Sequence, residues 1–96
     1  MLTSKQRADL RGQANSLETI FQIGKGGVTD QLVTGVNQAL AVRELIKLRV
    51  LESAGFTARQ AADDLAEATG ADVVQVIGSR MVLYRPAEEP KIKLRR

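Results

Sequence analysis

The chain has 96 residues, of which 44% are hydrophobic and 26% are charged, and its formal net charge is +3. This length supports one domain with a modest core, too small for a large enclosed active site. Cysteine and histidine are both absent, which excludes disulfides and thiolate metal sites and removes the residue most used for acid–base catalysis near neutral pH. The composition therefore argues against an enzyme, and we expect no cofactor and no bound metal.

Charge is distributed unevenly along the sequence. Between residues 57 and 77 four carboxylates accompany one arginine, so positive charge dominates elsewhere, which favours a basic face and a polyanionic partner. Asp63, Asp64 and Glu67 lie on successive turns of a predicted helix, and we interpret them as a solvated face rather than a metal site.

The N-terminus lacks the apolar core of a secretory signal, and no apolar run approaches the roughly 18 residues of a membrane span. We therefore expect a cytoplasmic protein.

The first predicted element is a helix. Thr3 and Gln6 have the spacing of a capping box, which predicts a helix at about residues 4–16. Its Arg7 and Arg11 are one turn apart and so lie on one side. The apolar stripe that should dock on the core consists of Leu10, Ala14 and Leu17.

A strand and a second helix are expected next. The short β-prone run that ends at Ile23 predicts a strand, because glycine follows it. After the glycines, Thr29 is a suitable N-cap, so the second helix should begin at Asp30. Gly35 inside this helix costs about 1 kcal/mol against alanine, and close packing on the sheet would explain it.

The second half of the chain repeats this alternation. The stretch ELIKLRVLE alternates apolar residues with Lys47 and Arg49, which is the period of a half-buried strand with one basic face. Thr57 followed by Gln60 is a second capping box and predicts a third helix. The stretches ADVVQVIG and RMVLYRP predict two strands joined by a tight turn at residues 78–80.

The resulting order is α-β-α-β-α-β-β, which predicts an α/β two-layer sandwich with a four-stranded mixed sheet. Right-handed crossovers place the two crossover helices on one face and leave the other open. The first three strands then run parallel, so the loops that follow them gather at one end of the sheet. We therefore expect Lys25 and Arg80 at one edge, with Lys47 and Arg49 on the neighbouring open face.

The stretch QIGKGGVTDQ, residues 22–31, places three glycines and a lysine before a helix N-terminus, which attracts anions. A nucleotide P-loop is disfavoured because Thr29, Asp30 and Gln31 stand where Gly-Lys-Ser/Thr is required. A second interpretation is a tight strand-to-helix turn without further function. The third is a GxxG clamp for a sugar-phosphate backbone, like the loop of KH domains, made of Gly24, Lys25, Gly26 and Gly27.

The stretches LTSKQRADLR, QIGKGGVTD, ELIKLRVL, TGADVVQVIG and VLYRP follow one another between residues 2 and 86. In this order they resemble the YhbY family, stand-alone bacterial forms of the CRM domain, named for chloroplast RNA splicing and ribosome maturation. The resemblance implies a fold similar to the C-terminal domain of bacterial translation initiation factor three. It also implies RNA binding through the GxxG loop and association with precursors of the large ribosomal subunit. We place a single RNA-binding domain at residues 1–86 and a flexible basic tail at residues 87–96.

The sequence thus predicts a monomeric RNA-binding accessory factor of large-subunit assembly, not an enzyme. Few aromatic residues are present, so recognition should rest on RNA backbone and shape, and Tyr84 is more typical of a packed strand residue than of one that stacks on a base. Two alternatives stay open: a ribosome-associated protein–protein interaction module and a nucleotide-binding protein. The residues expected to bind RNA are Gly24, Lys25, Gly26, Gly27, Arg7, Arg11, Lys47, Arg49 and Arg80.

Overall fold

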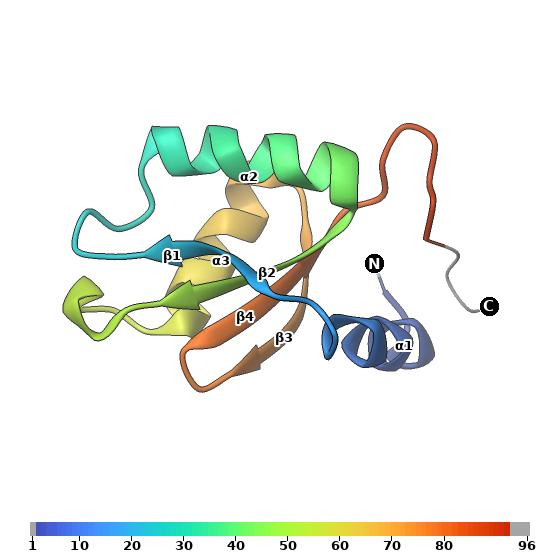
Figure 1. The fold of residues 1–96 in the computed structure, drawn as a ribbon, viewed down its shortest axis with the longest axis horizontal. Helices are drawn as coiled ribbons and strands as arrows, with labels where there is room; N and C mark the ends of the chain where they lie inside the picture. Colours follow the sequence, from blue (N-terminus) through green and yellow to red (C-terminus); the bar gives the residue numbers. More distant parts are fainter. Residues whose placement is uncertain (1, 93–96) are drawn as a thin grey trace.

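The computed structural model describes residues 2–92 and has the predicted order of elements. None of the helices in this range is long and apolar enough to cross a membrane. The first helix ends at Ala14 rather than at residue 16, and a short 3-10 turn follows the second strand. In chain order (Figure 1) the elements are α1 (Ser4–Ala14), β1 (Thr19–Ile23), α2 (Asp30–Arg43), β2 (Leu45–Val50), η1 (Glu52–Ala54), α3 (Ala58–Thr69), β3 (Asp72–Ile77) and β4 (Arg80–Tyr84).

The predicted helix starts are confirmed by their side-chain caps. The Thr3 hydroxyl accepts a hydrogen bond from the Gln6 backbone N–H at 3.1 Å, and the Gln6 carboxamide oxygen accepts from the Thr3 N–H at 3.0 Å. Thr57 and Gln60 form the same reciprocal pair at the start of α3, at 3.1 and 2.9 Å. Thr29 caps α2. Because each cap satisfies backbone donors that the helix itself leaves unpaired, these local sequences determine where the helices begin.

The four strands lie in the order β1-β2-β4-β3. Strands β1 and β2 are parallel, whereas β4 runs antiparallel to both β2 and β3. The first three strands therefore point in the same direction, as expected. Because β4 inserts between β2 and β3, the two edges of the sheet are β1 and β3.

The two crossover helices, α2 and α3, pack on one face of the sheet, where Ile46 and Leu48 of β2 join the main core cluster. Helix α1 lies on the opposite face. Its Leu10 and Ala14 pack with Leu45, which alternation directs away from the crossover helices. The expected helices on one face are thus α2 and α3, whereas α1 covers part of the face that was expected to stay open. The remaining described members of this second cluster are Leu2, Val74, Val82 and Tyr84, with Leu17 and Ile92 packed against it.

Gly35 of α2 lies against β1. A Cβ atom at this position would lie 3.2 Å from Cε1 of Phe21, closer than real Cβ contacts normally allow. Close packing of α2 on the sheet therefore explains a glycine inside the helix.

A buried carboxylate anchors the chain beyond β4. Glu44, at the C-terminal end of α2, is 0% exposed and has a positive φ of 66°. Its carboxylate oxygens accept hydrogen bonds from the backbone N–H groups of Ala87 at 3.0 Å, Lys91 at 2.6 Å and Ile92 at 3.0 Å. Burial alone would raise the pKa of Glu44, but these three hydrogen bonds and the nearby charge of Lys91 outweigh it, so the pKa is lowered.

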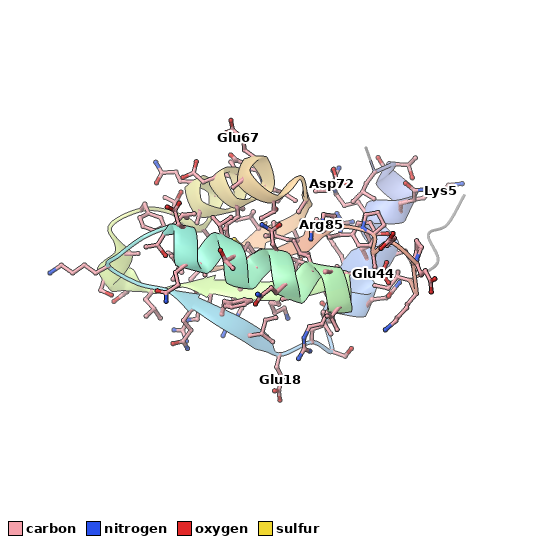
Figure 2. All side chains as sticks on the ribbon, turned by 90° about the horizontal axis from the view of Figure 1, so that it is seen from above. Lys5, Glu18, Glu44, Glu67, Asp72 and Arg85 are labelled. Carbon is pink, nitrogen blue, oxygen red and sulfur yellow. The ribbon has the colours of Figure 1, made fainter. Side chains whose placement is uncertain are left out.

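Arg85 ties the same region to two helices. Its guanidinium donates to the Asn37 side-chain oxygen at 2.6 Å, to the Asn37 carbonyl at 3.0 Å and to the Thr69 carbonyl at 2.7 Å. Figure 2 shows Arg85 and Glu44 close to the C-terminal half of α2. The chain is therefore held in place as far as Ile92, whereas residues 93–96 of the predicted tail lie outside the described residues.

Candidate nucleic-acid interface

The loops after β1, β2 and β3 meet at one end of the sheet, at the left of Figure 1. The backbone N–H of Val50 donates to the carbonyl of Ser79 at 2.7 Å, and that of Leu51 donates to the carbonyl of Ile23 at 2.9 Å. These bonds link the ends of β1 and β2 to the turn between β3 and β4. The predicted convergence of the three loops is confirmed.

The GxxG segment is a tight turn. The Gly27 N–H donates to the Gly24 carbonyl at 2.9 Å, and Lys25 is exposed at the tip of the turn. Gly27 has a φ of +70°, which favours glycine. The other two glycines have no such requirement, because a Cβ at Gly24 or Gly26 would meet its nearest neighbour at an ordinary 3.8 Å. Their missing side chains instead leave the backbone open to close approach by a ligand.

The basic face predicted for β2 continues onto β4. Arg49 lies directly opposite Arg80 in the antiparallel register of β2 and β4. Gln22 of β1 is aligned with Arg49, and Ile77 of β3 is aligned with Arg80. These four residues, Gln22, Arg49, Arg80 and Ile77, form one row across the sheet, which we call the arginine row. Since Leu48 between the basic residues of β2 faces the crossover helices, the row lies on the opposite face.

The arginine row is electrostatically unfavourable for the protein alone. Like charges directly opposite each other on neighbouring strands are destabilising, by an amount on the scale of about 0.2–1 kcal/mol that such pairs contribute. Within residues 2–92 neither Arg49 nor Arg80 forms a salt bridge with a carboxylate; the salt bridge in this range joins Arg59 and Asp63 at 3.5 Å. Two unneutralised arginines side by side on an exposed sheet suit a bound anion.

Lys47 differs from the exposed Arg49 because its side chain makes a hydrogen bond within the protein. Its ammonium group donates to the Leu17 carbonyl at 3.3 Å, and its side chain is partly buried. It therefore connects β2 to the segment between α1 and β1, close to the arginine row but with less freedom to reach a ligand.

Arg7 and Arg11 lie beside β3, at the sheet edge opposite β1 and the GxxG loop that follows it. They line a groove of about 500 Å³ along the edge strand β3, together with Arg59 and residues 73–77. Ile77 belongs both to this groove and to the arginine row, and its side chain is 64% exposed. The basic residues predicted to bind RNA thus fall into three groups: Lys25 in the loop, Lys47, Arg49 and Arg80 on the sheet, and Arg7 and Arg11 at the β3 edge. Ile77 joins the second group to the third. Sequence reasoning missed Ile77, because an alternating strand pattern does not show which apolar residue stays uncovered.

The predicted packing of Tyr84 is confirmed. Its side chain is 2% exposed and belongs to the cluster beneath α1, so it offers no surface for a base. The pKa of Tyr84 is raised mainly by burial, and to a smaller extent by the negative charges of Glu44 and Asp72. Phe56 is partly buried against Gly27, where a Cβ would lie 3.4 Å from its ring.

Three helices around a four-stranded mixed sheet, with a GKGG turn at the end of β1, define the α/β fold of a CRM domain. The chain belongs to the CRS1 / YhbY (CRM) domain family, whose family model matches residues 2–85.

Similar proteins cover nearly the whole chain. "Probable RNA-binding protein YqeI" of Bacillus subtilis is 42% identical over 91 residues, which are 95% of each chain. An "RNA-binding protein" of Haemophilus influenzae is 37% identical over 95 residues, 99% of this chain and 96% of that one. The solution structure of the hypothetical protein SAV1595 from Staphylococcus aureus aligns with a TM-score of 0.78 at 40% identity, covering 99% of this chain and 100% of that one.

Proposed function

We propose that this protein binds RNA as an accessory factor in assembly of the large ribosomal subunit, in the cytoplasm and as a monomer. The observation that carries the proposal is the arginine row, because Arg49 and Arg80 repel each other in the free protein and would both be neutralised by phosphate. The names of the relatives from B. subtilis and H. influenzae support RNA as the ligand.

The proposed mechanism is retention of the RNA backbone without chemical transfer. The turn from Gly24 to Gly27 precedes the N-terminus of α2, whose unpaired N–H groups and dipole attract a phosphate, and Lys25 adds a full positive charge. From this turn the RNA would cross the sheet over Arg49 and Arg80. Contacts further along the protein surface would come from Lys47, Arg7 and Arg11.

Lys25→Ala combined with Arg80→Ala tests this arrangement. Each phosphate that the protein no longer neutralises lowers the salt dependence of binding by about 0.7–0.9 in log–log slope. We therefore expect the slope to fall by roughly 1.5 and affinity at low salt to fall by about tenfold or more. The measurement is a filter-binding titration of a large-subunit precursor RNA at several salt concentrations. Unchanged affinity and slope would show that Lys25 and Arg80 do not contact the RNA.

Gly26→Ala separates ligand approach from loop folding. Its added Cβ would meet Thr29 at an ordinary 3.8 Å, so the free energy of unfolding should change by less than about 0.5 kcal/mol. RNA affinity should nevertheless fall several-fold, because the methyl group stands where a phosphate is expected to approach. Thermal unfolding and the same RNA titration check both expectations. If RNA affinity stays at the wild-type value, no phosphate approaches the backbone at Gly26.

The ribosomal part of the proposal needs a test in cells. Ultraviolet crosslinking followed by sequencing of the bound RNA should recover sites in large-subunit ribosomal RNA precursors. Recovery of other RNAs would preserve RNA binding but overturn the ribosomal assignment. Ribosome association that survives RNase and moderate salt would instead favour a protein–protein module.

A further inference from the structure

A second concave surface adjoins the GxxG turn on the side of α3. It has a volume of about 560 Å³ and is lined by Val28, Phe56, Gln60, Asp63 and Asp64, a size suited to a small planar ligand. The Phe56 ring packs beside Gly27, and Val28 directly follows the turn. This surface, which we call the α3 groove, is therefore contiguous with the turn proposed to hold a phosphate.

The polar groups of the α3 groove form a defined donor–acceptor pattern. The Gln60 carboxamide oxygen accepts from the Thr57 N–H at 2.9 Å, so the NH₂ end of this amide is the one left for a ligand. Asp64 lies one helical turn further along α3, and within residues 2–92 it makes no side-chain hydrogen bond or salt bridge. Asp63 is instead engaged with Arg59 at 3.5 Å. The groove thus offers an amide donor beside a carboxylate with two acceptor oxygens.

We infer that the α3 groove binds an unpaired guanine base of the RNA held by the neighbouring turn; the inference rests on the proposed function. The Watson–Crick edge of guanine presents the O6 acceptor next to two donors, N1–H and the N2 amino group. The Gln60 amide donates to O6, and the Asp64 carboxylate accepts from N1–H and N2–H. The exposed part of the Phe56 ring provides a stacking surface, as in other proteins that recognise splayed-out bases.

Other ligands match this pattern less completely. Adenine and cytosine offer one amino group to the carboxylate, and uracil offers one imino group, so none makes the paired interaction that guanine makes. An arginine side chain of a protein partner would satisfy Asp64 but has only donors, which leaves the Gln60 amide facing another donor. The negative charge of the groove repels phosphate, which keeps the RNA backbone on the turn and directs the base inward.

The test compares single-stranded hexanucleotides of uridine that carry one central guanine, adenine, cytosine or inosine, with binding to the full chain measured by fluorescence polarisation. The guanine oligonucleotide should bind about tenfold more tightly than the adenine, cytosine and all-uridine ones. Inosine, which lacks the N2 amino group, should fall between them. Asp64→Asn should reduce the preference to less than about twofold while affinity for the all-uridine RNA stays equal or rises.

Glu67→Gln is the matched control, because it removes the same charge from α3 at an exposed position outside the α3 groove (Figure 2). It should leave the guanine preference intact. Wild-type protein that binds all five oligonucleotides equally would overturn the base assignment and leave the proposed RNA binding standing. Failure to bind any of them or the precursor RNA would overturn both.

A nuclear magnetic resonance titration supplies an independent measurement. Guanosine 5′-monophosphate should shift the side-chain amide signals of Gln60, and cytidine 5′-monophosphate should shift them much less. If a short arginine-rich peptide moves these signals and the guanine nucleotide does not, the groove belongs to a basic protein segment and the inference is wrong.

Discussion

Glu44→Gln is expected to lower the free energy of unfolding at neutral pH by about 3 kcal/mol. The wild-type carboxylate accepts hydrogen bonds from the backbone N–H groups of Ala87, Lys91 and Ile92 in a fully buried position. A carboxamide keeps one acceptor oxygen but places an NH₂ donor against backbone donors. Buried N–H groups without an acceptor are costly, so the segment after β4 should detach from α2.

The measurement is urea denaturation of the variant beside Glu88→Gln. Glu88 lies in the same segment and is exposed, so its substitution should change stability by less than about 0.5 kcal/mol. Equal effects of the two substitutions would show that net charge, and not the buried hydrogen bonds, determines the loss. Amide hydrogen exchange should also become faster at Ala87 and Ile92 in Glu44→Gln alone.

The contribution of Glu44 also depends on pH. Its pKa in the folded protein is lowered by the three backbone hydrogen bonds, so folding favours the charged form. The contribution is therefore fully present above the unfolded-state pKa of about 4.3 and is lost as pH falls through the lower folded-state value. The stability difference between wild type and Glu44→Gln should accordingly shrink in acid. A difference that stays constant down to pH values of about 2 would contradict this origin.

Arg49→Ala with Arg80→Ala should change stability and affinity in opposite directions. Removing two like charges that face each other across β2 and β4 should raise the free energy of unfolding by a few tenths of a kcal/mol. RNA affinity should fall by about 100-fold, on the basis of roughly 1.4 kcal/mol for each arginine–phosphate hydrogen bond that the variant cannot make. Thermal unfolding and RNA titration at one salt concentration measure the two effects.

Arg43→Ala with Lys5→Ala is the charge-matched control. Both residues are exposed, and neither belongs to the arginine row or lines the groove that holds Arg7 and Arg11. This variant loses the same net charge, but RNA affinity should fall no more than a few-fold, through long-range electrostatics alone. If both double variants weaken binding equally, the arginine row is not a local contact site.

Local signals in the sequence predicted most of the secondary structure. The capping boxes at Thr3 and Thr57 set the starts of two helices because the hydrogen bonds that form them span only three residues. Alternation in β2 predicted the direction of Lys47 and Arg49 because side chains on a strand point to opposite faces. The GKGG turn was recognisable because the hydrogen bond that closes it, from the Gly27 N–H to the Gly24 carbonyl, spans only three residues.

Features that depend on distant segments were not predictable in this way. The pairing of Arg49 with Arg80 exists because β4 inserts between β2 and β3, and no local pattern specifies that insertion. No local pattern distinguishes Glu44 from other charged residues between a helix and a strand. Its role appears only when the segment at residues 87–92 folds back over it.

By itself, the sequence determined the order of elements, the helix caps and the position of the glycine-rich turn, since each depends on residues within a few positions of one another. The tertiary structure decided that α1 covers the second face and that the basic residues divide into a turn, a sheet row and a strand edge. These outcomes depend on strand order and on burial, which result from the packing of segments far apart in the chain.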